Sequence, residues 1–295
     1  MPRIATNGVE LEYETFGAAH APPVLLIMGL GAQMILWDEE FCEAIVQRGY
    51  RVIRFDNRDV GHSTKLEHAG LPNVATALAA VAQGRPPSAA YTLHDMADDT
   101  AGLLGALGID AAHVVGASMG GMIGQTLAIR HPKRVRTLTS IMSTTGDPGL
   151  PPATPEAMQV LMTPAPTQRE AYIAHHVKVS KVIGSPGFPF DAEAARERGA
   201  RVFDRGVFPA GVARQLVAIL ASGNRKPALA SVRAPTLVIH GTADPLVPIA
   251  AGRDTAAAVP GSELVEIEGM GHDLPREVWP RLVNAIAKHA GRSPA

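Results

Sequence analysis

Short apolar runs alternate with segments of helical spacing along most of this 295-residue chain. Continuous apolar runs predict strands that are covered on both faces, because such strands need no polar positions. Residues 24–28 form such a run, and further strands are predicted over residues 51–55, 114–116, 135–141, 236–240 and 263–267, where polar residues stand among the apolar ones. Apolar residues three or four positions apart predict helices over residues 38–47, 94–107, 119–129, 249–258 and 278–290. Strands that alternate with helices indicate an α/β fold, with a mostly parallel sheet and helices on both of its faces.

Two stretches depart from this alternation. Residues 9–15 alternate apolar and polar positions, as a half-exposed edge strand does, and Asn7-Gly8 predicts a hairpin to residues 4–6. From residue 148 to residue 228 the chain is first rich in proline and then predicts short helices without a clear strand. We therefore expect eight strands and a helical cap inserted after the sixth. The expected domains are an α/β core, residues 1–147 and 229–295, and a cap, residues 148–228.

One turn carries the strongest chemical signal. Residues 116–120 read Gly-Ala-Ser-Met-Gly between a predicted strand and a predicted helix. A serine on such an elbow has a strained backbone and an exposed hydroxyl, and glycines two positions away on either side avoid collisions with the strand and the helix. The Met119 amide, at the helix N-terminus, then faces the space where a substrate oxyanion forms. We therefore predict Ser118 as a nucleophile, with an ordinary Gly/Ser-rich loop as the alternative.

A serine nucleophile needs a base, and the base needs an orienting acid. In an elbow fold the acid and then the histidine follow the serine along the chain, each in a loop after a later strand. Asp244 comes four residues after one buried strand, and His272 comes five residues after the next. These two residues are the predicted acid and base. His62, in a polar turn, is the alternative base, and His240 is expected to pack beneath the site.

The rest of the site has weaker signals. A second oxyanion donor is expected where a buried strand ends in Gly29-Leu30-Gly31. The Leu30 amide is the candidate donor, and Gly31 is the alternative. Large apolar residues predicted to line a substrate pocket, each with core packing as its alternative, are Trp37, Met158, Phe188 and Phe208.

Composition narrows the function classes. The formal net charge of −1 gives no electrostatic case for nucleic acid, and no apolar run is long enough to span a bilayer. The single cysteine, Cys42, excludes an internal disulfide, and no Cys/His/carboxylate spacing points to a metal. The acidic group Asp95, Asp98 and Asp99 fits a solvated helix start. Since no signal-peptide pattern is present, we expect a cytoplasmic protein, a monomer or homodimer, that needs no cofactor.

The chain resembles the α/β-hydrolases over nearly its whole length. The segments that carry this likeness are Leu25-Leu-Ile-Met-Gly-Leu-Gly, Phe55-Asp-Asn-Arg-Asp-Val-Gly-His-Ser, Gly116-Ala-Ser-Met-Gly-Gly, His240-Gly-Thr-Ala-Asp and Gly269-Met-Gly-His. The nearest likeness is to the aclacinomycin methylesterase-like esterases. It is carried by Met28-Gly29, Arg54-Phe-Asp-Asn-Arg-Asp, Val179-Ser-Lys, Phe188-Pro-Phe-Asp and Gly269-Met-Gly-His-Asp-Leu-Pro. This likeness implies a helical cap over the site. The chain departs from the family pattern at Met28, where many family members have a histidine.

Together these features predict the hydrolysis of a small carboxylic ester through a Ser-His-Asp triad and an acyl-enzyme. A serine at the elbow argues against dehalogenase and epoxide-hydrolase chemistry, since those members of the fold use aspartate there. Lactonase, thioesterase, C–C hydrolase and perhydrolase or haloperoxidase activity on the same triad stay open. The alternative from another class is a hydrolase-fold protein that binds a small ligand without turnover.

Overall fold

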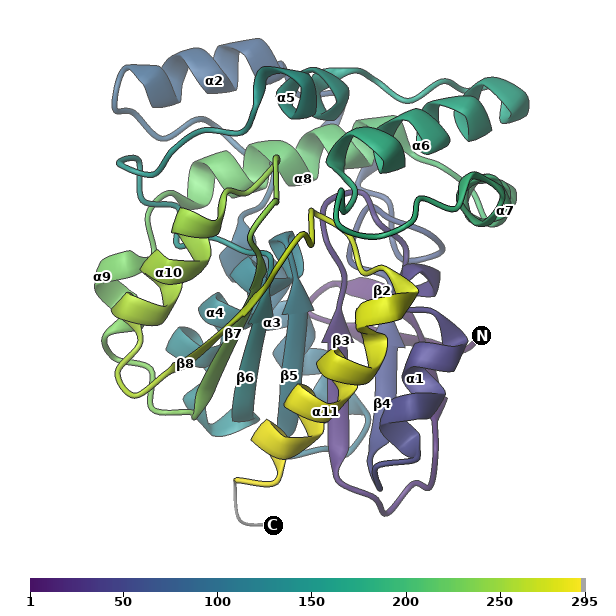
Figure 1. Cartoon of the computed structure of the whole chain (residues 1–295). Helices are drawn as coiled ribbons and strands as arrows, with labels where there is room; N and C mark the ends of the chain where they lie inside the picture. The colour runs from purple at the N-terminus through teal and green to yellow at the C-terminus, as the bar shows by residue number, and fades with distance from the viewer. Residues whose placement is uncertain (293–295) are drawn as a thin grey trace.

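The computed structural model describes residues 1–292, and its centre is a sheet of eight strands (Figure 1). The strands are β1 (Arg3–Thr6), β2 (Val9–Phe16), β3 (Pro23–Ile27), β4 (Arg51–Phe55), β5 (Ala112–Ala117), β6 (Val135–Ile141), β7 (Thr236–Gly241) and β8 (Glu263–Ile267). Their order in space is β1-β2-β4-β3-β5-β6-β7-β8. β1 and β2 pair antiparallel to their neighbours, and β3 to β8 run parallel. The predicted eight-stranded, mostly parallel sheet is confirmed.

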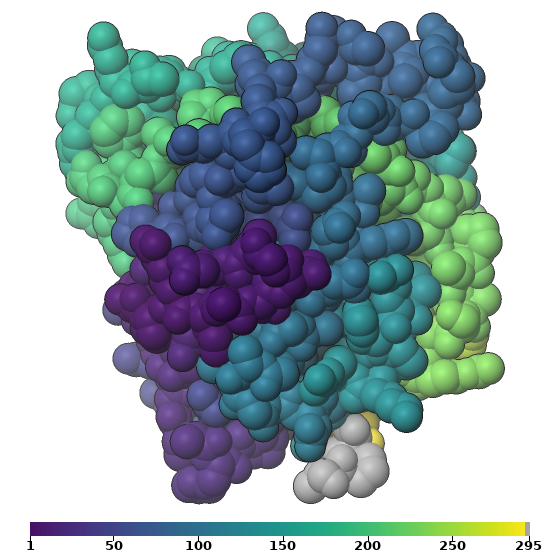
Figure 2. Space-filling view, turned by 180° about the vertical axis from the view of Figure 1, so that it is seen from behind, coloured from purple at the N-terminus to yellow at the C-terminus, as the bar shows by residue number. Residues whose placement is uncertain are grey.

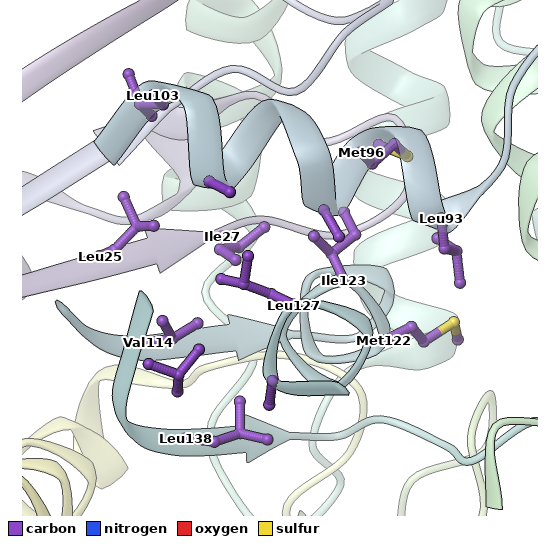
Figure 3. Packing of buried hydrophobic residues seen from close by; sticks show 14 of the residues in the cluster. Leu25, Ile27, Leu93, Met96, Leu103, Val114, Met122, Ile123, Leu127 and Leu138 are labelled. Atoms are coloured by element: carbon purple, nitrogen blue, oxygen red, sulfur yellow. The ribbon is translucent and has the colours of Figure 1, made fainter. Parts of the chain in front are cut away.

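Helices cover both faces of this sheet. The helices of the core are α1 (Glu39–Val46), α3 (Leu93–Ala106), α4 (Met119–Arg130), α10 (Ile249–Ala258) and α11 (Trp279–Ala290), with the short 3₁₀ turns η1 (Met34–Leu36), η2 (Glu67–Ala69), η3 (Pro132–Arg134) and η4 (Arg276–Val278). In β3, Leu25 and Ile27 pack toward α3 and α4, as Figure 3 shows, whereas Val24 and Leu26 pack toward α1 and α11. Alternate residues of a strand point to opposite faces, so one continuous apolar run supplies both cores.

The predicted acidic group at the start of α3 has three different environments. Asp95 closes the N-terminal capping box, and Asp98 pairs with Arg130 on α4. Asp99 is only 2% exposed, and its two oxygens each accept a hydrogen bond of 2.6 Å from Arg58. The expectation of a solvated face is therefore wrong for Asp99, because an arginine 41 positions earlier in the chain pairs with it in the interior.

After β6 the chain forms a layer of helices above the carboxyl ends of the parallel strands (Figure 1). These helices are α5 (Pro155–Met162), α6 (Arg169–Ile183), α7 (Ala192–Asp204) and α8 (Pro209–Ser222), and the short helix α9 (Lys226–Leu229) that follows them lies lower, beside α10. Two buried ion pairs join this layer to the loop after β4: Arg205 lies 2.7 Å from Asp56, and Arg214 lies 2.8 Å from Asp59. Removing one partner of such a pair typically costs about 3–5 kcal/mol, so these contacts hold the layer against the sheet. The division into core and cap domains stays a prediction.

A further helix, α2 (Val74–Ala82), lies outside the predicted elements. It occupies the upper layer near α5 and α8 in Figure 1, and the blue part of the chain around it forms the upper surface in Figure 2. Its sequence is almost uniformly apolar, and Leu78 and Val81 are 40% and 42% exposed. Such a sequence lacks the apolar periodicity from which a helix is predicted. Neither α2 nor any other helix within residues 1–292 is long and apolar enough to cross a membrane.

Candidate active site

Ser118 lies at the junction of β5 and α4, in the elbow that the sequence predicts. Its φ of 56° and ψ of −120° are unusual for a residue with a side chain. A Cβ on Gly116 would lie 2.1 Å from the carbonyl oxygen of Gly120, and a Cβ on Gly120 would lie 2.1 Å from that of Ile27. Both positions therefore need glycine, and the close packing of backbone on backbone holds the strained serine in place.

Gly120→Ala is expected to destabilise the fold by about 3 kcal/mol or more, because the added methyl group collides with backbone. Gly105→Ala, on the exposed side of α3, is the matched control. A Cβ there meets only Arg134 Nη2 at 3.4 Å, and alanine is the better helix former. Urea unfolding of both variants measures the difference. A Gly120→Ala midpoint equal to that of the wild type would contradict this packing.

The three predicted side chains meet at the carboxyl edge of the sheet. Ser118 Oγ lies 3.0 Å from His272 Nε2, and His272 Nδ1 lies 2.7 Å from Asp244 Oδ2. Asp244 follows β7 and His272 follows β8, so two neighbouring parallel strands bring the acid and the base to one place. When Nδ1–H donates to Asp244, Nε2 is left to accept the hydroxyl proton of Ser118.

Asp244 is held as an anion. Its side chain is fully buried, and Oδ1 accepts backbone hydrogen bonds from Leu246 at 2.9 Å and from Val247 at 2.8 Å. Burial alone raises the pKa of Asp244, but the positive charge of protonated His272, together with hydrogen bonds to the carboxylate, outweighs burial and lowers it to about 2. The carboxylate is therefore ionised at neutral pH, where it fixes the tautomer of the imidazole.

The two other histidines considered from the sequence have different surroundings. His240 is fully buried, and its Nε2 donates to the carbonyl oxygen of Val247 at 2.7 Å, so it supports the loop that carries the acid. His62 lies 3.2 Å from Glu12, and its side chain is 42% exposed. The alternative base is thus paired elsewhere and does not contact Ser118.

The turn after β3 approaches the nucleophile closely. A Cβ on Gly29 would lie 3.2 Å from Ser118 Cβ, so the backbone of this turn passes directly beside the serine. Among the hydrogen bonds between residues 1–292, none uses the amide of Leu30 or of Met119 as its donor. Both predicted oxyanion donors therefore keep an N–H group that a substrate oxygen can use.

Gln215, on α8, holds this turn from the helical layer, and the sequence did not reveal it. Its side chain is fully buried. Oε1 accepts a hydrogen bond from the Gly31 amide at 2.8 Å, and Nε2 donates to the carbonyl oxygen of Arg58 at 2.8 Å. The Gly31 amide is thus already bonded, which removes the alternative oxyanion donor. No local signal could have found Gln215, because its partners lie 184 and 157 positions away.

A small cavity lies between the oxyanion turn and the helices above it. Its volume is about 50 Å³, room for one or two water molecules, and its lining includes Gly31, Val212 and the predicted pocket residue Phe208. Two other predicted pocket residues do not line it. Met158 is 40% exposed on α5, and Phe188 packs against the core cluster of α1 and α11.

Trp37 belongs to the core. It is fully buried and stacks on Phe41 of α1, with ring centroids 5.5 Å apart, while Phe41 makes an edge contact with Trp279 at 5.8 Å. This aromatic cluster fills the space between the sheet and the helices α1 and α11. The structure therefore places Trp37 in the core packing that was its alternative, and not on the cavity.

The remaining reactive groups stand apart from this site. Cys42 is fully buried on α1, and burial raises the pKa of its thiol to about 12, so it acts as a packing residue. In the described part of the chain, residues 1–292, no three His, Cys, Asp or Glu side chains are grouped so that they could hold a metal ion. The groups that meet at the elbow are a hydroxyl, an imidazole and a carboxylate.

Comparison with known protein families agrees with this geometry. Residues 22–183 match the family model described as alpha/beta hydrolase fold. The chain belongs to the α/β-hydrolase fold family. A second part of this α/β-hydrolase, residues 218–278, matches the family model described as TAP-like protein. The fold class predicted from the sequence is thus confirmed.

Individual relatives of this α/β-hydrolase include esterases. It is 32% identical over 309 residues to the rhodomycin D methylesterase of Streptomyces peucetius, with 97% of each chain covered. It is 28% identical to a putative carbamate hydrolase of Serratia proteamaculans, over 86% of this chain and 85% of that protein. The solved enol-lactonase from Burkholderia xenovorans LB400 has a TM-score of 0.74 at 24% identity, over 98% of this chain and 100% of that one. The predicted likeness to methylesterases is confirmed.

Proposed function

We propose that this α/β-hydrolase is a serine carboxylesterase that hydrolyses a small ester through an acyl-enzyme on Ser118. The observation that carries the proposal is the unbroken series of contacts from Ser118 Oγ through His272 to Asp244, at 3.0 and 2.7 Å. A hydroxyl is a poor nucleophile at neutral pH, and a neighbouring base with an orienting acid activates it.

In the acylation step, Ser118 Oγ attacks the ester carbonyl carbon and its proton passes to His272 Nε2. The carbonyl oxygen becomes an oxyanion, which accepts hydrogen bonds from the Leu30 and Met119 amides. Asp244 stabilises the imidazolium that forms. The C–O bond to the alcohol then breaks, and the alkoxide leaves as an alcohol with the proton from His272.

Deacylation repeats these steps with water as the nucleophile. His272 takes a proton from the water as its oxygen attacks the acyl carbon, and the same two amides hold the second oxyanion. Collapse of this intermediate returns the proton to Ser118 Oγ and releases the carboxylic acid. Every proton transfer runs between the Ser118 hydroxyl, the imidazole, the substrate and the attacking water, so the mechanism requires no added cofactor.

The name of a close relative in sequence supports a methyl ester as the substrate class. The relative with 32% identity is named a methylesterase. We therefore assign the methyl ester of a carboxylic acid as the preferred substrate, ahead of lactones, thioesters and peracid chemistry.

A panel of substrates with one acyl group and different leaving groups tests this assignment. We expect kcat/KM to be highest for the methyl ester and to fall about tenfold or more for the ethyl and propyl esters, because a site that prefers a methyl group discriminates by about this factor for each added methylene. The same acid offered as a thioester, and a simple lactone, are the comparisons in a pH-stat assay. Faster turnover of the lactone or the thioester, or peroxide-dependent halogenation that exceeds hydrolysis, would reassign the reaction.

A further inference from the structure

The helical layer binds directly to the loop that carries His272. Residues 183–187, which begin with the last residue of α6, lie against residues 269–273, which follow β8. Figure 1 shows the loop after β8 reaching this layer. Four hydrogen bonds join the two segments: His272 N to Ile183 O at 2.7 Å, Gly187 N to Gly269 O at 2.9 Å, Gly271 N to Ser185 Oγ at 2.8 Å, and Ser185 Oγ to Asp273 Oδ1. We call this pair of segments the histidine clamp.

Backbone packs on backbone within the histidine clamp. A Cβ on Gly271 would lie 2.2 Å from the carbonyl oxygen of Gly184, and a Cβ on Gly187 would lie 2.7 Å from Gly269 Cα. At these glycines the two backbones touch directly, with no side chain between them that could absorb a relative shift. A displacement of residues 183–187 would be passed on to the backbone of His272.

Ser185 supplies the side chain that ties the histidine clamp together. Its hydroxyl accepts from the Gly271 amide and donates to the carboxylate of Asp273, so it bonds to the residues on both sides of His272. Burial raises the pKa of Asp273, and the hydrogen bond from Ser185 and the charges of Arg198 and His272 offset part of that rise. Without the hydroxyl, both the amide and the buried carboxylate would lose a partner, which is costly in the interior.

We propose that Ser185 is a positioning residue for the reaction, through which the helical layer holds the imidazole of His272 in line with Ser118. The inference rests on the proposed esterase function, since it assigns His272 as the base. The hydroxyl at position 185 does not reach the reacting atoms. It acts by fixing the backbone on either side of the histidine, and therefore the 3.0 Å contact between His272 Nε2 and Ser118 Oγ.

Ser185→Ala is expected to lower kcat about tenfold to a hundredfold with KM nearly unchanged, because an ångström-scale misplacement of a catalytic group has effects of this size. Ser180→Ala, one turn earlier on α6, is the matched control. The Ser180 hydroxyl has no hydrogen bond to another side chain or to backbone among the side-chain bonds found within residues 1–292, so kcat should stay at the wild-type value. A Ser185→Ala variant with wild-type kcat, or with a raised KM alone, would overturn the proposal.

A double-mutant cycle with Asp273→Ala separates the clamp from a general loss of stability. If Ser185 acts through its bond to Asp273, the double variant should lose no more kcat than the worse single variant. Additive losses would contradict a shared contact. Urea unfolding of all variants, measured in parallel, shows whether the loss in kcat follows the loss of stability, which is the result a merely structural role predicts.

Hydrogen exchange keeps this inference distinct from the proposed function. Ser185→Ala should accelerate exchange of the Gly271 and His272 amides whatever reaction the protein catalyses, because both belong to the clamp. If the wild-type protein shows no ester hydrolysis that depends on Ser118, the esterase proposal fails, and the positioning role fails with it. Faster amide exchange in Ser185→Ala would in that case still show that the histidine clamp is a structural contact. Normal hydrolysis by Ser185→Ala would end the positioning role alone.

Discussion

Ser118→Ala should lower kcat for ester hydrolysis on the order of 10⁶-fold, because the acyl-enzyme cannot form without the hydroxyl. The oxyanion donors and the cavity remain in the variant, so substrate binding should persist and KM should change little. Release of p-nitrophenol from a short-chain p-nitrophenyl ester, measured at an enzyme concentration high enough to detect the residual rate, checks this value.

Ser231→Ala is the control for this experiment. Ser231 is exposed, and within residues 1–292 its hydroxyl bonds only to the carbonyl oxygen of Ala228 at 2.7 Å, so its removal should leave kcat unchanged. Equal rates for wild type and Ser118→Ala would mean that the hydrolysis comes from another group or from a contaminant. That outcome would favour the ligand-binding alternative for this fold.

Asp244→Asn is expected to lower kcat by about 10⁴-fold while the fold stays intact. In the wild type, Oδ1 of Asp244 accepts from the Leu246 and Val247 amides, and Oδ2 faces His272 Nδ1 at 2.7 Å. In asparagine the carbonyl oxygen would stay on the two amides, and the NH₂ group would then donate to Nδ1. The imidazole proton would move to Nε2, where it points at Ser118 and prevents the nitrogen from acting as a base.

The control for this variant is Asp110→Asn, at an exposed position whose carboxylate makes no contact with the site. Circular dichroism and the unfolding midpoint check that both variants are folded, and kcat on the same p-nitrophenyl ester separates them. An Asp244→Asn variant within about tenfold of wild type would show that the tautomer of His272 does not depend on Asp244.

The depressed pKa of Asp244 also sets a pH dependence. Since the pKa is about 2 in the folded protein and 3.8 for an unperturbed aspartate, the ionised carboxylate favours folding above about pH 4. This contribution is lost as the pH falls through about 2. The pH profile of activity, measured from pH 4 upward, should therefore show no change caused by titration of Asp244. In the acid range, the free energy of unfolding of the Asp244→Asn variant should depend less on pH than that of the wild type.

The sheet and the meeting of Ser118, Asp244 and His272 were predictable because their signals are local. Apolar runs marked the strands of the parallel sheet, and the glycines at 116 and 120 are required by contacts within the elbow itself. Asp244 and His272 each follow a predicted strand by a few residues, and parallel strands end at a common edge. The strands that precede them, β7 and β8, are consecutive in the chain and adjacent in the sheet, so the structure brings Asp244 and His272 together.

The features that the sequence did not reveal depend on distant partners. Asp99 looks like one member of an exposed acidic group, yet Arg58 pairs with it in the interior. Gln215 and Ser185 lie on the helical layer among many polar residues, and only the folded chain shows that they contact the oxyanion turn and the histidine loop. Trp37 was equally compatible with the pocket and the core, because large apolar side chains suit both.

Labelling with a fluorophosphonate shows whether Ser118 forms a covalent intermediate. The reagent phosphonylates a serine hydroxyl only when a neighbouring base activates it. We expect one adduct per chain in the peptide that contains Ser118, and its loss in Ser118→Ala and Asp244→Asn. An adduct on another residue, or none at all in folded wild-type protein, would contradict it.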